Sequence, residues 1–90
     1  MGKRRAGPYF VVITEVQRSG LSRLGITASR HVGGAVTRNR VKRLVREVFR
    51  RHQYQISPAR DVLVIARPAA AHASYAQVKQ ELAAALKING

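Results

Sequence analysis

Few side chains in this sequence are suited to acid–base or metal chemistry. The chain contains three histidines, four acidic residues and no cysteine, whereas a protein nuclease needs acid–base groups and often a carboxylate cluster that holds two metal ions. His31, His52 and His72 fall in a predicted turn, at a predicted helix end and in a linker, with no carboxylate at catalytic spacing. Without cysteine, disulfides and thiolate metal sites are excluded. We therefore predict no catalytic residue and no metal site on the protein.

Binding chemistry, in contrast, is concentrated in one stretch. From Arg38 to Arg51 seven basic residues accompany a single acid, Glu47, and only Lys42 among the seven is not an arginine. The planar guanidinium group makes bidentate contacts with phosphate and stacks on bases, which makes a nucleic acid the favoured partner. The candidate binding residues are Arg38, Asn39, Arg40, Lys42, Arg43, Arg46 and Arg50.

The charge of the whole chain also indicates a polyanionic partner. Seventeen Lys and Arg residues oppose four Asp and Glu residues, a formal net charge of +13, and such an excess destabilises a compact state by self-repulsion. A hydrophobic fraction of 46% over 90 residues suits one packed domain and is too high for a disordered basic tail. No apolar run approaches the roughly 18 residues of a membrane span, and no signal peptide is recognised. We expect a cytoplasmic protein without a membrane partner.

The basic stretch is predicted to be a helix from Ala35 to His52. At about 100° per residue, one side forms an apolar stripe of Val41, Leu44, Val45, Val48 and Phe49. The opposite arc is basic, and Arg38 and Arg40 flank the stripe. Like-charged pairs at i,i+4, such as Arg38 with Lys42, destabilise an isolated helix, so a merely solvated face explains this pattern poorly. A membrane-surface helix would need the apolar stripe, which the domain's own core requires. Both DNA and RNA remain open as partners, with a slight preference for RNA.

The elements that must position this helix follow from the remaining patterns. We predict strands at Tyr9–Val16 and Ser22–Arg30 that pair as an antiparallel hairpin. The unbroken apolar run Asp61–Pro68 indicates a central strand covered on both faces, followed by a flexible link. Ser74 and Gln77 form a capping-box pattern that opens a final helix, which continues through Tyr75, Val78, Leu82 and Leu86 and ends at Asn89-Gly90. The order β-β-α-β-α predicts an α+β fold, a small two-layer α/β sandwich.

Three stretches together resemble one known family. "VGGAVTRNRVKRLVREVFR" (Val32–Arg50), with "LGITASRHVG" overlapping its start and "DVLVIARP" after it, is similar to the signature of the bacterial ribonuclease P protein component. The resemblance covers essentially all of the chain from Gly2 onward, so residues 1–90 are expected to form a single RNA-binding domain. It implies a left-handed β-α-β crossover, which the general handedness rule would not predict. The family's usual N-terminal helix is expected to be absent.

The resemblance also implies a function. In the family a catalytic RNA, assisted by the protein, cuts the 5′ leader from precursor tRNA. The candidate residues of the basic helix would contact the catalytic RNA, and weaker candidates for the leader are Tyr9, Phe10, Thr27 and Ser29. Phe10 has a core alternative. Magnesium ions would be held mainly by RNA phosphates, and no protein oligomer is required. Gly34 and Ile13 depart from the family pattern, where Asn and Tyr are usual. The alternative function is a ribosomal or other structural RNA-binding protein without a processing role.

Overall fold

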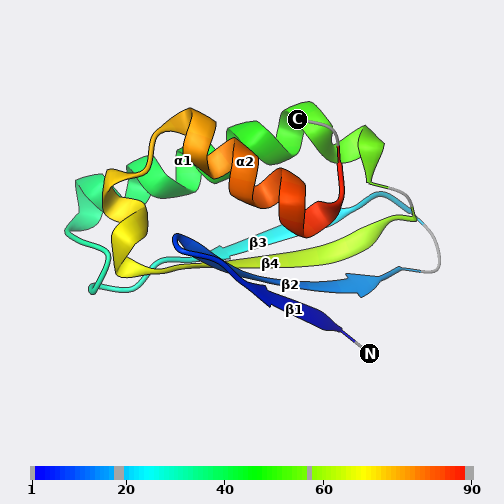
Figure 1. Ribbon diagram of the computed structural model, residues 1–90, viewed down its shortest axis with the longest axis horizontal. Coiled ribbons are helices and arrows are strands. Elements are labelled where there is room, and N and C mark those ends of the chain that lie inside the picture. The colour runs from blue at the N-terminus through cyan, green and yellow to red at the C-terminus, as the bar shows by residue number, and fades with distance from the viewer. Residues whose placement is uncertain (1, 18–19, 57, 89–90) are drawn as a thin grey trace.

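The chain folds into one four-stranded sheet with both long helices on the same face (Figure 1). The computed structural model describes residues 2–17, 20–56 and 58–88. The strands are β1 (Lys3–Ala6), β2 (Phe10–Val16), β3 (Arg23–Thr27) and β4 (Arg60–Ala66). The α-helices are α1 (Ala35–His52) and α2 (Tyr75–Leu86), and short 3-10 helices occupy Gln53–Gln55 and Pro68–His72. The α+β class and the two-layer arrangement are as predicted.

The strand pairing differs from the predicted hairpin. The sheet order is β1-β2-β4-β3, so β4 lies between the two strands that were expected to pair with each other. β2 runs antiparallel to β4, whereas β3 runs parallel to it, with Val12 opposite Val64 and Ile26 opposite Val64. The hairpin prediction was wrong because β4 takes the central position and separates β2 from β3. β2 instead forms its hairpin with β1, a strand that the sequence analysis missed.

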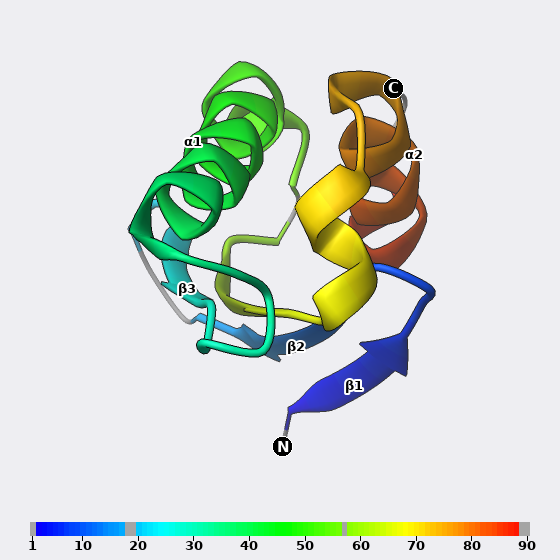
Figure 2. The same cartoon turned by 90° about the vertical axis from the view of Figure 1, so that its left-hand side faces the viewer.

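The parallel pair β3 and β4 is connected through α1. With the helices toward the viewer and these strands pointing upward, β4 lies to the left of β3, as Figures 1 and 2 show from two sides. The crossover is therefore left-handed, as the resemblance implied, in contrast to about 98% of such connections.

The core lies between the sheet and the two helices. Side chains of β2 and β4 that alternate toward the helices, such as Phe10, Val12 and Val64, are fully or almost fully buried. They meet the apolar stripe of α1 and the buried residues Val78 and Leu82 of α2. The opposite face of the sheet is not covered by a helix, and there Leu63 is 39% exposed. The prediction that the central strand is covered on both faces was wrong, because the helices lie on one side only.

The connection to α2 is more ordered than a flexible link. Pro68–His72 forms a 3-10 helix, and Ala70 and Ala73 are buried in the core. The predicted capping box is present: the Ser74 hydroxyl accepts from the Gln77 N–H, and the Gln77 side chain accepts from the Ser74 N–H. Lys87 ends α2 in the left-handed conformation, while the predicted end at Asn89-Gly90 lies outside the described residues.

A carboxylate on α2 fixes the β1–β2 turn to the helix layer. The Glu81 oxygens accept hydrogen bonds from the backbone N–H groups of Tyr9 and Phe10, at 3.1 and 2.6 Å. A Cβ atom at Gly7, in the same turn, would lie 2.6 Å from the Glu81 carboxyl carbon. A larger residue at position 7 would therefore have to displace this carboxylate.

Candidate nucleic-acid interface

The apolar stripe of α1 determines which basic side chains point outward. Val41, Val45 and Val48 are buried against the sheet, so the opposite side of the helix faces away from the core. No acidic residue lies in the first turn, and the last turn carries Arg50, Arg51 and His52, which suits the negative end of the helix dipole. We call the candidate binding residues of α1 other than Arg40 the outer arc: Asn39, Lys42, Arg43, Arg46 and Arg50 lie on the side away from the core, and Arg38 flanks the apolar stripe.

The outer arc is accessible but not uniformly so. Asn39, Arg43 and Arg46 are exposed, whereas Arg38 and Lys42 are half-buried. The Arg38 Nε atom is buried and has no hydrogen-bond partner among the described residues. The exposed guanidinium groups of Arg43 and Arg46 can donate to an external anion. The outer arc therefore offers a row of positive charge along one side of the domain.

Arg40 differs from the other candidate residues because its guanidinium contacts the protein itself. Its two terminal nitrogens donate to the backbone carbonyls of Ala71 and Ala73, at 3.3 and 2.9 Å. These carbonyls belong to the segment that leads into α2. Arg40 therefore connects the N-terminal half of α1 to the segment that precedes α2. The helical periodicity placed Arg40 beside the apolar stripe but gave no signal for these acceptors.

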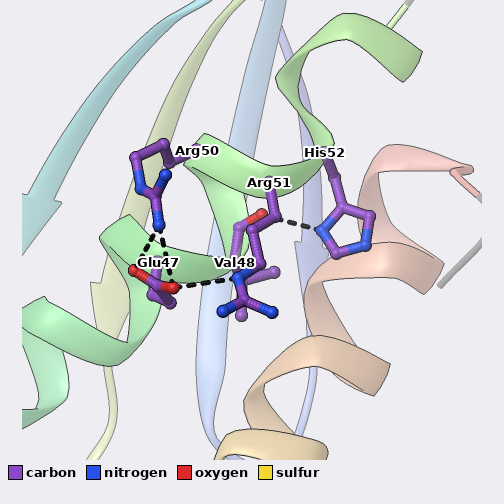
Figure 3. Close-up of polar contacts among 5 residues, drawn as sticks. All are labelled: Glu47, Val48, Arg50, Arg51 and His52. Carbon is purple, nitrogen blue, oxygen red and sulfur yellow. Dashed lines mark hydrogen bonds and ion pairs between the residues drawn. The ribbon is translucent and has the colours of Figure 1, made fainter.

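Glu47 partly neutralises the C-terminal end of α1. Its carboxylate pairs with Arg50 at 3.0 Å and with Arg51 at 2.9 Å, as Figure 3 shows. The hydrogen bonds from Arg50 and Arg51 hold the pKa of Glu47 below its usual value. The Arg51 guanidinium carbon also lies 5.9 Å from the centroid of the Tyr75 ring on α2. Positive charge on α1 is therefore least compensated in its N-terminal and middle turns.

The four candidates for leader contacts occupy different environments at one end of the sheet. Thr27, at the end of β3, and Ser29, just after it, are exposed, and the Ser29 hydroxyl accepts from the His31 N–H at 3.3 Å. Tyr9 is half-buried and lines a pocket of about 430 Å³ beside Glu81. Phe10 is 0% exposed and faces the helices. Its ring cannot reach a leader in this conformation, which corrects its placement among the candidates and agrees with its core alternative.

The register explains why three of these candidates share an end. Val11 of β2 pairs with Ile65 of β4, which in turn pairs with Thr27 of β3. The start of β2 and the end of β3 therefore lie on the same side of the molecule. The chain then turns through residues 28–34 into the start of α1. Thr27 and Ser29 thus lie on the connection that leads directly into the outer arc.

The uncovered face of the sheet contains polar and apolar groups that the sequence analysis did not select. A shallow hollow of about 500 Å³ includes Ile13 and Leu63 together with an ion pair between Arg23 and Asp61. The Arg23 Nε lies 2.8 Å from the Asp61 carboxylate. The hydrogen bond from Arg23, with a second from Gln17, lowers the pKa of Asp61. Strand alternation was the signal for this face, but the incorrect hairpin obscured which residues are neighbours.

The groups that acid–base or metal chemistry would need are dispersed. His31 and His72 are exposed, and the His52 Nδ1 lies 2.8 Å from the Val48 carbonyl oxygen. Within residues 2–17, 20–56 and 58–88, no three His, Cys, Asp or Glu side chains are grouped so that they could hold a metal ion. No helix of that same part of the chain is both long and apolar enough to cross a membrane.

Comparison with known proteins gives a consistent result across the chain. The profile of the Ribonuclease P family matches residues 1–89. A ribonuclease P protein component from Listeria monocytogenes is 40% identical over 88 residues, which is 97% of this chain and 74% of the relative. Relatives from Desulfatibacillum aliphaticivorans and Halalkalibacterium halodurans are 46% and 52% identical, and the matches span only 58% and 50% of their own lengths.

Solved structures agree with the sequence relatives. The RNase P protein from Thermotoga maritima superposes with a TM-score of 0.86 at 35% identity, over 99% of this chain and 87% of that chain. The Staphylococcus aureus RNase P protein superposes with a TM-score of 0.82 at 39% identity, over 96% of this chain and 79% of that chain. The similarity therefore includes both the sequence of α1 and the β1-β2-β4-β3 architecture that positions it.

Proposed function

Because this chain belongs to the ribonuclease P protein family, we propose that it binds the catalytic RNA of ribonuclease P and assists removal of the 5′ leader from precursor tRNA. The observation that carries this proposal is the outer arc of α1, whose N-terminal and middle basic side chains lack acidic partners among the described residues. The proposed role is that of a protein subunit in an endonuclease holoenzyme, with the chemistry done by RNA. The proposed setting is the cytoplasm, where precursor tRNA is processed in bacteria, and no protein oligomer is required.

The proposed mechanism of binding is electrostatic. Each phosphate neutralised by the outer arc releases condensed counterions, so affinity falls steeply with salt. If six to ten phosphates are contacted, affinity should fall by about 10³ to 10⁵ between 50 and 200 mM salt. Arg38, Lys42 and Arg46 follow one another at i,i+4 on the outer arc. Bound RNA would relieve the mutual repulsion of this row, which supports a single RNA-binding domain over residues 1–90.

For the leader, we propose contacts at the end of the sheet next to the start of α1. Thr27 and Ser29 offer exposed hydroxyl groups there, and Tyr9 offers a half-buried ring on the neighbouring part of the sheet. Hydroxyl groups donate to and accept from phosphate and sugar oxygens, and aromatic rings stack on unpaired bases. These contacts would hold the single-stranded leader of the precursor tRNA next to the catalytic RNA that the outer arc binds. Arg40 is assigned to positioning, since it holds α1 to the segment before α2.

Magnesium fits RNA better than it fits this protein. Mg²⁺ prefers several oxygen ligands in octahedral geometry, whereas the carboxylates of Glu47 and Asp61 are paired with arginines and that of Glu81 accepts two backbone N–H groups. The described side chains therefore do not form a magnesium site. We propose that magnesium acts at RNA phosphates, and no step here depends on a protein-bound ion.

The test is a leader-removal assay at low magnesium. The catalytic RNA and precursor tRNA are combined with wild-type protein or with Lys42→Gln/Arg46→Gln, which removes two charges from the outer arc. The α2 variant Lys79→Gln/Gln80→Glu lowers the net charge by the same amount and serves as the matched control. We expect stimulation by wild type and by the control, and a large loss with the outer-arc variant. No stimulation by wild type would leave a structural RNA-binding role, and preferential competition by duplex DNA over structured RNA at matched salt would contradict the RNA assignment.

A further inference from the structure

A second group of basic side chains lies at the other edge of the sheet, on its helix-facing side. In the register of the sheet, Lys3 is opposite Thr14 and Arg5 is opposite Val12, so Lys3 and Arg5 point to the same side as these buried residues. Arg60 alternates with Val62 along β4 and therefore shares this side. These residues line a hollow of about 260 Å³ beneath the end of α2, which we call the β1 pocket. Its cationic lining residues are Lys3, Arg4, Arg5, Arg60 and Lys87, of which Arg4 alternates with Lys3 and Arg5 along β1 and points to the other face of the sheet.

Within the part of the chain that the structure describes, no acidic side chain lines the β1 pocket. Asp61 is paired with Arg23 on the opposite face of the sheet, and Glu47 is paired on α1. Glu81 is held by the backbone N–H groups of Tyr9 and Phe10. Cationic residues gathered around one hollow concentrate positive potential there, which favours an anionic ligand.

Arg60 provides a second, independent observation that favours an anionic ligand. Its Nε atom is buried without a hydrogen-bond partner among the described residues, and its guanidinium takes part in none of the ion pairs found there. Arg23, Arg40 and Arg67, by contrast, each have protein acceptors. A buried donor without a partner costs free energy, and an oxyanion that draws the Arg60 guanidinium into the pocket would satisfy it.

The size and lining of the pocket limit the class of ligand. Its volume of about 260 Å³ is below the roughly 300–1,000 Å³ typical of drug-sized ligands, so a phosphate group fits better than a whole cofactor. A membrane surface would need large apolar side chains that insert into lipid. The apolar residues of the lining are Val12, which is buried, and the small Ala85. Phosphate carried by a nucleic acid is therefore favoured.

The β1 pocket and the outer arc lie on opposite flanks of the domain. α1 lies over the β3 side of the sheet, whereas β1 forms the other edge under α2 (Figure 2). The lining residues Lys3, Arg60 and Lys87 lie where β1 and β4 begin and α2 ends. That end of the sheet is away from the start of α1 (Figure 1). We propose that the β1 pocket binds backbone phosphates of a second RNA segment, so that the protein bridges two segments. This inference rests on the proposed RNA-binding function.

The test compares three double variants of the full chain in binding to the catalytic RNA over a range of salt concentrations. Lys3→Gln/Arg5→Gln removes two charges from the β1 pocket, Lys42→Gln/Arg46→Gln removes two from the outer arc, and Lys79→Gln/Gln80→Glu is the matched control. Both Lys3 and Arg5 are exposed, so unfolding midpoints in urea should not change. We expect the β1-pocket variant to bind roughly tenfold more weakly. The salt slope, which is the magnitude of the slope of log affinity against log salt concentration, should be lower by about 1.4 to 1.8, because about 0.7 to 0.9 counterion is released per phosphate.

The outcomes separate this inference from the function on which it rests. If the β1-pocket variant matches the control while the outer-arc variant loses affinity, the second site is wrong and the RNA-binding function stands. If both the β1-pocket variant and the outer-arc variant bind the RNA like wild type, or if wild type does not bind the RNA, the proposed function fails. The bridging proposal then fails with it. Binding of anionic lipid vesicles that depends on Lys3 and Arg5, with no change in RNA affinity, would overturn the nucleic-acid assignment of the pocket.

Discussion

Replacing Arg40 by alanine should destabilise the fold, although Arg40 is one of the candidate RNA-binding residues of α1. The change removes two donors from the carbonyls of Ala71 and Ala73, at 3.3 and 2.9 Å. A hydrogen bond from a charged donor contributes about 1.5–3 kcal/mol when buried. The longer bond is beyond the usual N–H···O range, and Arg40 is only half-buried. We therefore expect a loss of about 2 kcal/mol in the free energy of unfolding, or roughly 8–16 °C in Tm for a domain of this size.

Urea unfolding followed by circular dichroism measures this loss directly. Arg43→Ala is the control because Arg43 is exposed on the same helix, and surface substitutions usually stay within about 0.5 kcal/mol. Arg40→Lys should be intermediate, since one ammonium lacks the planar fork that reaches both carbonyls. In RNA binding, Arg43→Ala should lower the salt slope by about 0.7 to 0.9, whereas folded Arg40→Ala should not. The reasoning is refuted if Arg40→Ala unfolds at the same urea concentration as Arg43→Ala and shows the larger drop in slope.

Three further perturbations have expected outcomes. Gly7→Ala should lower the unfolding free energy by about 1–3 kcal/mol, because its Cβ would displace the Glu81 carboxylate from its backbone partners; an unchanged urea midpoint would contradict this contact. Glu47→Gln should strengthen RNA binding and raise the salt slope, since it frees the two helix arginines that Glu47 pairs with; weaker binding in a salt titration would count against the outer arc. The hydrogen bond from Arg23 lowers the pKa of Asp61 in the folded protein. The ionised Asp61 carboxylate therefore stabilises the fold at pH values above 3.8, its pKa in the unfolded chain. This stabilisation is lost as the pH falls through the lower pKa of the folded state. Asp61→Asn should therefore flatten the decline of the urea midpoint below about pH 4, and an equally steep decline would exclude the ion pair as its cause.

Periodicity and capping predicted the helices well because both are local properties. The bounds of α1, Ala35–His52, follow from the apolar stripe, and the Ser74–Gln77 capping box at the start of α2 depends only on residues three apart. The family assignment from the "TRNRVKR" stretch is also confirmed. These features required no knowledge of which strands are neighbours.

Strand pairing could not be predicted in the same way, because pairing is decided by segments far apart in the sequence. β2 and β3 are close together in the sequence, which favours a hairpin locally, yet β4 pairs with both of them and occupies the position between them. The strand β1 was missed because "KRRA" lacks apolar alternation; it is a basic edge strand. The contacts of Arg40 with carbonyls beyond β4 likewise depend on tertiary packing.

The central position of β4 has a consequence for the order in which the domain assembles during synthesis. β3 has no strand partner until residues 60–66 have been made, and before then β2 can pair only with β1. The apolar side of α1 therefore has an incomplete surface to pack on while the ribosome completes β4. Non-local pairing of this kind slows folding and leaves apolar groups open to aggregation. Substitutions that weaken β4 should therefore reduce the yield of soluble protein from cells more strongly than equally destabilising substitutions in α2.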